Sequence, residues 1–315
     1  MSGENRAAED FRPRLVVLTG PTGVGKTALS LTLARDSGAE IVNSDSRQVY
    51  RYLDIGTAKP TPAERLQAPH HLLDVVDPDE DFSAAAYLGL ARPLIARLSG
   101  QGRPLLIVGG TGLYLRSLLR GLFPGPGRDD LVRAGLAEEA ARLGRAHLYS
   151  RLVRVDPKTA ARLSPNDLVR VVRALEVFEL TGRPISAFQA EHGLGERPYQ
   201  TRIYCLILPR AELSARIELR ARAMFEAGLL EETAGLLARG YAPDLKPLQS
   251  IGYKQASACL AGRLGLAEAV GETIKETRRL AKRQLTWHRS QPDTVWVTPA
   301  DTDRIRAEAA RFFFG

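Results

Sequence analysis

The feature that most constrains this chain is a glycine loop with the sequence Gly20-Pro21-Thr22-Gly23-Val24-Gly25-Lys26-Thr27. It follows an apolar run, residues 15–18, that predicts a buried strand, and it precedes residues 28–34, which favour a helix. A strand, such a loop and a helix in this order are typical of a P-loop. Backbone N–H groups and the helix N-terminus would face phosphate oxygens, with a positive charge from Lys26 and an oxygen ligand for Mg²⁺ from Thr27. The loop leaves open which polyphosphate binds and whether a phosphorus–oxygen or a carbon–oxygen bond breaks.

Other runs predict that this loop belongs to an open parallel sheet. Residues 40–43, 104–108 and 201–208 are further expected strands, and the continuous apolar run at 104–108 is typical of a strand covered on both faces. Helical patterns separate these strands. We therefore predict an α/β fold, a P-loop NTPase-like parallel sheet flanked by helices.

A turn-rich segment, residues 121–127, predicts the start of an insertion. The pattern from residue 129 to about residue 182 is all helical, with a helix start at Pro165-Asn166-Asp167. We predict an inserted all-helical domain at 124–199 and an α/β core formed by 1–123 and 200–315. Residues 1–13 are expected to be disordered.

Composition narrows the class of protein. The 315 residues are 44% hydrophobic and 25% charged, which suits a large soluble domain with an insertion. No apolar run reaches the roughly 18 residues of a membrane span, and the polar start is no signal peptide, so we expect a cytoplasmic protein without membrane contact. Cys205 and Cys259 are too few for a disulfide framework or a zinc site, and the five histidines lack metal-ligand spacing.

The net charge of +8 indicates an anionic partner larger than a nucleotide, because a small nucleotide needs only local positive charge. The most basic stretch is residues 277–289, expected to be helical, with Arg278, Lys282 and Arg289 on one stripe and Arg279 and Arg283 on the next. Such a run of like charge opposes folding unless an anion lies against it, so we predict contact with a phosphate backbone.

One carboxylate is placed to face the phosphate site. Asp45 follows the expected strand 40–43, and ligands of open α/β sheets bind beyond the carboxyl ends of strands. The alternative is that Asp45 or a neighbouring serine caps a helix, and both interpretations can hold together. Where an ATPase commonly carries a second carboxylate, after the strand 104–108, this chain has Gly109-Gly110. That difference disfavours an ordinary ATPase and makes Asp45 the nearest candidate for a metal or base carboxylate.

Seven stretches together resemble the tRNA dimethylallyltransferase family: the glycine loop, Ser-Asp-Ser-Arg-Gln-Val-Tyr at 44–50, Asp-Ile-Gly-Thr-Ala-Lys-Pro at 54–60, Val-Gly-Gly-Thr-Gly-Leu-Tyr at 108–114, Arg-Ala-Leu-Glu-Val at 173–177, Ser-Ile-Gly-Tyr-Lys-Gln at 250–255 and Thr-Arg-Arg-Leu-Ala-Lys-Arg-Gln-Leu-Thr-Trp at 277–287. The resemblance covers residues 14–290. It implies transfer of a dimethylallyl group from its diphosphate to N6 of the adenosine 3′ to the anticodon, in tRNAs reading codons that begin with U. It also implies Mg²⁺ dependence, a monomer, and a tRNA-binding role for the helical domain at 124–199.

The resemblance assigns roles by position. The diphosphate would lie on residues 20–27, with Lys26, Mg²⁺ on Thr27, and Arg220 neutralising the charge that grows on it. Asp45 would accept the proton of the adenine amine, with Thr22 beside the reacting centre. Together with the basic stretch, the residues predicted to contact tRNA are Asp45, Ser46, Arg47, Gln48, Thr111, Val169, Arg170, Val171, Val172, Arg173, Gln249, Ser250, Ile251, Gly252, Tyr253, Lys254, Arg278, Arg279, Lys282 and Arg283.

Departures and alternatives remain. The loop reads Thr22-Gly23-Val24-Gly25 where many relatives have Thr-Ala-Ser-Gly, which removes a hydroxyl but no backbone donor. Arg222 falls where relatives vary and receives no role. Two other functions stay open, an isopentenyltransferase acting on free adenine nucleotide and a P-loop kinase or RNA-stimulated ATPase. The insertion and the charge disfavour the first, and Gly109-Gly110 disfavours the second.

Overall fold

The structure is a computed structural model that describes residues 12–193 and 195–315. Most of the segment expected to be disordered, residues 1–11, lies outside the described residues. Pro13, in contrast, is placed at the start of the fold, where its carbonyl accepts a hydrogen bond from the Gln200 amide at 3.0 Å.

The chain divides into two compact units. The first joins Met1–Leu119 to Arg197–Gly315, and the second is Arg120–Glu196. The insertion predicted at 124–199 therefore begins and ends a few residues earlier in the structure.

The first unit contains one parallel sheet with the strand order β3-β2-β4-β1-β5-β6. Its strands are β1 (Arg14–Thr19), β2 (Glu40–Asn43), β3 (His70–His71), β4 (Leu105–Val108), β5 (Gln200–Leu206) and β6 (Thr294–Val297). All neighbouring strands pair in parallel. The expected strands correspond to β1, β2, β4 and β5. The edge strands β3 and β6 are short, and the sequence analysis missed both.

Alternate residues of β1 belong to two separate hydrophobic clusters, which shows that the sheet is buried on both faces. Leu15 and Val17 pack in one cluster, with residues of α3 (Ala84–Gly100), α4 (Gly112–Arg120), α11 (Leu229–Ala238) and α12 (Tyr253–Leu260). Val16 and Leu18 pack in the other, with residues of α1 (Lys26–Ser37), α10 (Arg210–Glu226), α13 (Leu266–Arg289) and α14 (Thr302–Phe314). Burial on both faces explains the continuous apolar strands.

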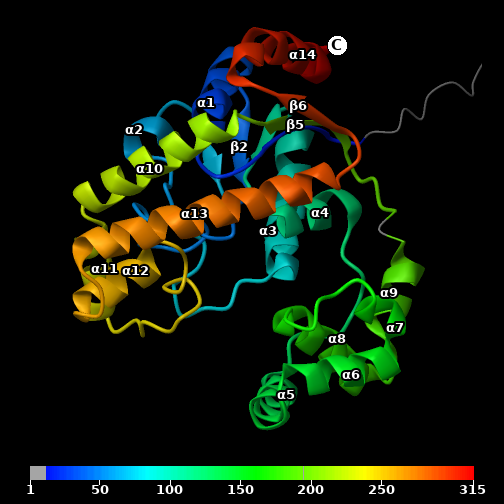
Figure 1. Cartoon of the computed structure of the whole chain (residues 1–315). Helices are drawn as coiled ribbons and strands as arrows, with labels where there is room; N and C mark the ends of the chain where they lie inside the picture. Colours follow the sequence, from blue (N-terminus) through cyan, green and yellow to red (C-terminus); the bar gives the residue numbers. More distant parts are fainter. Residues whose placement is uncertain (1–11, 194) are drawn as a thin grey trace, which may run out of the picture. The chain divides into compact units, whose positions relative to one another are not determined.

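The helices of the first unit pack against the sheet and against one another. Ser83 caps α3, its side chain accepting from the Ala86 amide at 3.1 Å. The basic stretch 277–289 forms the second half of α13, which packs along α10 and α12 (Figure 1). Two short helices, α2 (Pro62–Arg65) and the 3₁₀ helix η1 (Pro299–Asp301), complete this unit. Within the described chain, no helix combines the length and apolar character needed to span a membrane.

The second unit is a small helical bundle with its own core. It contains α5 (Asp130–Leu143), α6 (Arg145–Val155), α7 (Pro157–Ala160), α8 (Leu168–Thr181) and α9 (Ile185–His192). Helix α8 starts after the predicted Asp167 and ends at Gly182, whose φ of 69° is left-handed. Burial alone would raise the pKa of Glu176 on this helix, but hydrogen bonds from Arg133, Arg173 and the Asp129 amide lower it to about 2.

Candidate active site

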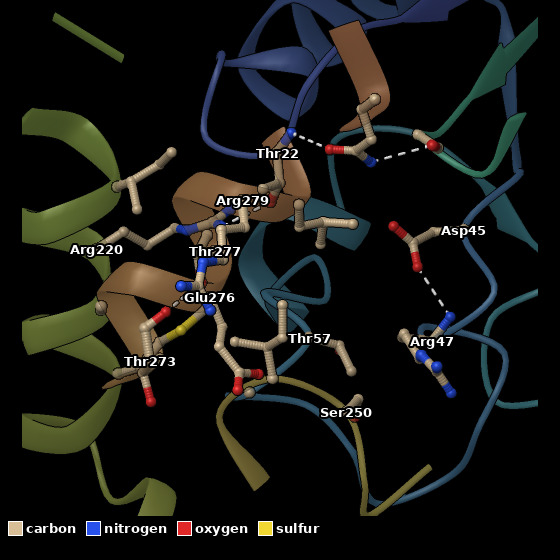
Figure 2. Close-up of a pocket in the computed structure, with 18 of the residues that line it drawn as sticks. Thr22, Asp45, Arg47, Thr57, Arg220, Ser250, Thr273, Glu276, Thr277 and Arg279 are labelled. Carbon is tan, nitrogen blue, oxygen red and sulfur yellow. Dashed lines mark hydrogen bonds between the residues drawn. The ribbon is translucent and has the colours of Figure 1, made fainter. Parts of the chain in front are cut away.

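The loops that follow β1, β2 and β4 meet at the carboxyl-terminal edge of the sheet, where they border a cavity of about 650 Å³, here called cavity 1. Helices α10 and α13 and the segment before α12 complete its wall (Figure 2). Its lining residues include Thr22, Asp45, Ser46, Arg47, Thr111, Arg220, Gln249, Ser250, Ile251, Arg279, Arg283 and Gln284.

A second cavity of about 1080 Å³, cavity 2, opens beside the first. Its lining includes Gly23, Gly25, Lys26 and Thr27 of the glycine loop, residues between Gln48 and Arg65, and one face of α10. Thr22, Asp45, Thr57, Arg220 and Met224 line both cavities. These residues mark the boundary where a ligand held on the glycine loop would meet a ligand in cavity 1.

The glycine loop has the backbone that its sequence predicts. Gly23 and Gly25 have φ values of 84° and 101°, which disfavour any residue with a Cβ atom. The Lys26 ammonium donates to the carbonyls of Gly20 and Pro21 at 3.0 and 2.9 Å, and burial lowers the pKa of Lys26 to about 8. Burial therefore makes the Lys26 ammonium easier to deprotonate, and a bound anion would stabilise its charged form.

Not every amide of the loop is available to a phosphate. The Thr22 amide donates to the side-chain oxygen of Gln284 on α13 at 2.9 Å. Within the segment predicted to hold the diphosphate, residues 20–27, the Thr22 amide is therefore already used by the protein.

Arg220 lies beside the glycine loop. Its guanidinium Nη2 donates to Thr22 Oγ1 at 2.6 Å. Burial lowers the pKa of Arg220, and the nearby charge of Asp45 partly opposes that effect. Arg216, one turn earlier on α10, pairs with Glu212 at 2.8 Å.

Asp45 closes a tight turn and keeps one carboxylate oxygen toward the cavity. Its Oδ1 accepts from the Arg47 amide at 2.8 Å, while its own amide donates to Asn43 Oδ1 at 3.0 Å. The other carboxylate oxygen points into the open space (Figure 2). The alternative that Asp45 caps a helix is wrong, because no α-helix follows in residues 46–52. The carboxylate does accept a hydrogen bond from a backbone amide, as the carboxylate of a helix cap would.

The loop after β4 is pressed against the Asp45 turn. A Cβ atom on Gly109 would lie 2.2 Å from the Ser44 carbonyl oxygen. Thr111 Oγ1 accepts from the Ser46 amide at 2.9 Å and donates to Ser46 Oγ at 3.2 Å. These contacts explain why glycine replaces the carboxylate of an ATPase here: there is no room for a side chain.

Gln48 and Arg47 support neighbouring loops. Gln48 Nε2 donates to the carbonyls of Thr57 and Ala58 at 3.2 and 3.0 Å, and Arg47 Nη1 donates to the Lys246 carbonyl at 3.3 Å. The buried Lys59 ammonium bonds Asp54 and Asp74, each at 2.6 Å. The wall of cavity 2 is therefore held by internal bonds that the sequence analysis missed.

Several residues predicted to contact tRNA are core residues instead. Tyr253 is fully buried, donates to Glu232 and accepts from the Gly56 amide at 3.2 Å. Gly252, beside it, is also buried. Val171 is fully buried in the core of the helical unit. The side chains of Tyr253 and Val171 act in packing, which motif position alone does not distinguish from RNA contact.

The other residues of segment 169–173, which was predicted to contact tRNA, differ in their exposure and bonding. Arg173 is held by Glu176 at 2.6 Å and by the Pro126 carbonyl at 2.7 Å, so it has a structural role within the helical unit. Val172 is half-buried, whereas Val169 and Arg170 are exposed. The surface of this segment thus consists mainly of Val169 and Arg170.

The predicted basic residues of α13 are exposed in the structure. Arg279 and Arg283 line cavity 1, Lys282 faces away from the core, and Arg278 pairs with Glu218 at 3.0 Å. Lys254 pairs with Glu276 at 3.0 Å. The rim of cavity 1 is therefore positively charged along this helix.

The residues present fit a magnesium ion bound together with a phosphate ligand. Thr27 and Asp45 both line cavity 2, and Mg²⁺ commonly takes one or two protein oxygens, waters and substrate phosphates. The described part of the chain contains no cluster of three or more acidic, histidine or cysteine ligands.

Comparisons with known proteins agree with this geometry. A family model described as IPP transferase matches residues 48–291, and one described as isopentenyl transferase matches residues 13–74. The tRNA dimethylallyltransferase of Desulfosudis oleivorans is 52% identical over 286 residues, covering 91% of each chain.

Solved structures of tRNA-modifying transferases are also similar to this chain. The chain resembles the tRNA isopentenylpyrophosphate transferase of Bacillus halodurans with 38% identity and a TM-score of 0.71, covering 96% of this chain and 97% of that one. A eukaryotic dimethylallyltransferase acting on tRNA matches with 27% identity and a TM-score of 0.78, covering 95% of this chain and 77% of that one. The fold, the site and these similarities together show that the chain belongs to the IPP transferase family, whose similar curated members are named tRNA dimethylallyltransferase.

Proposed function

We propose that this protein transfers a dimethylallyl group from dimethylallyl diphosphate to N6 of an adenosine in tRNA. The acceptor is the adenosine 3′ to the anticodon in tRNAs that read codons beginning with U, and the product is N6-isopentenyladenosine. The observation that carries the proposal is the shared boundary of the two cavities, where Thr22 of the glycine loop, Asp45 and Arg220 line both spaces.

The glycine loop would bind the donor's diphosphate. Amides of residues 23–27, the Lys26 ammonium and the Arg220 guanidinium present positive charge toward it. As the carbon–oxygen bond of the donor lengthens, negative charge grows on the leaving diphosphate, and fixed donors stabilise that charge in the transition state. When bound, Mg²⁺ on Thr27 would add positive charge at the same group.

Asp45 would act on the acceptor. The adenine amine forms a bond to the allylic carbon while the bond from that carbon to the diphosphate oxygen breaks, and the nitrogen then loses a proton. The Asp45 oxygen that points into the cavity is placed to accept it. To enter the cavity, the adenosine must leave its stack, as in other enzymes that modify bases.

The basic rim would hold the anticodon arm. Arg279 and Arg283 line cavity 1, and Arg47, Gln249 and Ser250 border the same space. Single-stranded RNA loops are read through stacking, base edges and phosphate contacts. We also propose that the exposed Val169 and Arg170 meet the RNA. By the same resemblance we propose that the active form is a monomer and that the location is cytoplasmic, where tRNA is processed.

A three-way acceptor assay tests this function. The protein is incubated with labelled dimethylallyl diphosphate and either tRNA, AMP or no acceptor, and with ATP and tRNA in a separate reaction. We expect label only in tRNA. Label in AMP would favour the free-nucleotide isopentenyltransferase, and ATP hydrolysis that exceeds prenyl transfer would favour the kinase or ATPase alternative.

A further inference from the structure

Gln284 forms a bridge between two loops of the active site. It lies on α13, where its Oε1 accepts from the Thr22 amide at 2.9 Å and its Nε2 donates to the Gly110 carbonyl at 3.0 Å. Thr22 belongs to the glycine loop after β1, and Gly110 belongs to the loop after β4. Figure 2 shows both bonds.

The chemistry of the partners fixes the orientation of this side chain. A backbone amide can only donate and a carbonyl can only accept, so the amide oxygen must face Thr22 and the NH₂ group must face Gly110. Gly110 also leaves room for the bridge, since a Cβ atom there would lie 2.5 Å from Gln284 Nε2. The bridge therefore requires an uncharged side chain that has both a donor and an acceptor.

The bridge continues to the turn that carries Asp45. Thr111, next to Gly110, donates its amide to the Ser44 carbonyl at 3.3 Å and accepts from the Ser46 amide at 2.9 Å. A chain of hydrogen bonds thus runs from the glycine loop through Gln284 and Thr111 to both sides of Asp45. The two halves of the proposed reaction, leaving group and base, lie at its ends.

We propose that Gln284 is a positioning residue that sets the separation between the diphosphate loop and the Asp45 turn. The inference rests on the proposed function of that site. It assigns to α13 a second role besides its exposed basic face: the helix holds the reacting groups in register.

Other residues of α13 pack the helix against the core of the first unit. One turn further along α13, Trp287 lies against Gly112, where a Cβ atom would be 2.4 Å from its ring, and His288 Nε2 lies 3.2 Å from Thr19 Oγ1. We expect these contacts to keep the helix docked when Gln284 is changed, while the bridge is lost.

Gln284→Met tests the bridge, because methionine has a similar length and no amide. We expect kcat to fall about 100-fold, since misplacement of reacting groups by about 1 Å has that effect. The KM for tRNA should change little, because Gln284 holds loops rather than the basic rim. A kcat within about twofold of wild type, or a loss seen only in the KM for tRNA, would overturn the proposal.

Gln284→Glu tests the donor half of the bridge. A glutamate can accept from Thr22, but it can donate to Gly110 only when protonated. The charged groups that line cavity 1 with it are Asp45, Arg47, Arg220, Glu276, Arg279 and Arg283, and the excess of arginines keeps the glutamate ionised. His288 stays neutral, because burial lowers its pKa to about 4.

We expect the kcat of Gln284→Glu to fall about as far as that of Gln284→Met, because the ionised carboxylate keeps the Thr22 bond but repels the Gly110 carbonyl. A kcat within about twofold of wild type would overturn the proposal. Measuring the thermal midpoint of each variant confirms that a folded enzyme is compared.

Gln291→Glu is the matched control, because Gln291 donates to Ser290 Oγ at 2.9 Å and touches neither loop. Its kcat should equal that of wild type. Failure of the proposed function and failure of this inference are distinguishable: inactive wild type rejects the function, whereas active wild type with fully active Gln284 variants rejects the positioning role alone.

Discussion

Arg220 and Thr22 are joined by a hydrogen bond of 2.6 Å from the guanidinium Nη2 to the threonine hydroxyl. This bond connects α10 to the glycine loop across the boundary of the two cavities. Because the Thr22 amide is held separately by Gln284, Thr22 is fixed by two helices at once. A substrate that meets Thr22 therefore meets a rigid group with a buried positive charge beside it.

Replacing Arg220 should reduce transfer. We expect Arg220→Ala to lower kcat/KM for the prenyl donor by about 100- to 1000-fold, because a preorganised donor to the leaving group is lost. Arg220→Lys should recover part of the activity, since it keeps the charge but not the planar fork. Steady-state kinetics measure both effects.

Arg222→Ala is the control on the same helix. Arg222 pairs with Glu218 at 3.0 Å on the exposed face, and its removal should leave kcat/KM unchanged within about twofold. Equal losses for Arg220→Ala and Arg222→Ala would exclude a specific role for Arg220.

Diphosphate binding should weaken at alkaline pH. Burial lowers the pKa of Lys26 to about 8, and a bound anion favours the charged form, so binding raises that pKa and takes up a proton. Affinity is then full below pH 8 and falls as the pH rises above it. Calorimetric titration with pyrophosphate between pH 7 and pH 9.5 measures the change.

Lys26→Arg separates this effect from the titration of pyrophosphate itself, because arginine stays charged throughout. The difference in affinity between the two proteins should grow with pH. If the two affinities change in parallel, Lys26 does not titrate in this range.

Binding of tRNA should depend on salt through the exposed arginines of α13. Replacing both Arg279 and Arg283 by alanine should weaken binding and reduce the slope of log K against log salt by about 2, one for each lost phosphate contact. The salt dependence of filter binding measures this slope. Arg304→Ala, which removes an arginine paired with Asp301 and Glu308, should leave it unchanged.

Gly109→Ala should damage both stability and activity. Its Cβ atom would lie 2.2 Å from the Ser44 carbonyl oxygen, so the backbone next to Asp45 must shift. We expect the free energy of unfolding to fall by about 1–3 kcal/mol, as for other overpacked sites, with an additional loss of kcat. Denaturant unfolding and transfer assays measure the two quantities.

The paired control is Gly89→Ala on α3, where nothing lies within 4 Å of the new atom. Alanine in a helix interior should raise the free energy of unfolding by about 0.5–1 kcal/mol. If Gly109→Ala behaves in the same way, the loop after β4 is not packed as the structure shows.

The order of elements around the glycine loop could be predicted because each signal is local. Residues 15–18, 20–27 and 28–34 carry the strand, loop and helix patterns directly, and Asp45 follows its strand within the same short stretch. Sequence order along a parallel sheet then brings the loops to one edge. Strands β3 and β6 were missed because a two-residue and a half-exposed four-residue segment carry no periodic signal.

The contacts that assemble the site were harder to predict because they join distant segments. Gln284 is separated from Thr22 by 262 positions, and its partners depend on the register of α13 against the sheet. Likewise, the predicted RNA contacts Tyr253 and Val171 are buried, since a motif records which residues recur and not which way they point. A polar residue on the packed face of a basic helix was the one available signal for Gln284.

The central claim is that the glycine loop holds the leaving group of a prenyl donor opposite the base Asp45. The most direct measurement is a crystal structure with a non-reactive analogue of dimethylallyl diphosphate and an anticodon stem-loop. We predict the diphosphate on the amides of residues 23–27, with Lys26 and Arg220 in contact, and a flipped adenine whose N6 lies within hydrogen-bond distance of the Asp45 carboxylate. A diphosphate bound elsewhere, or an adenine that does not reach Asp45, would contradict the account.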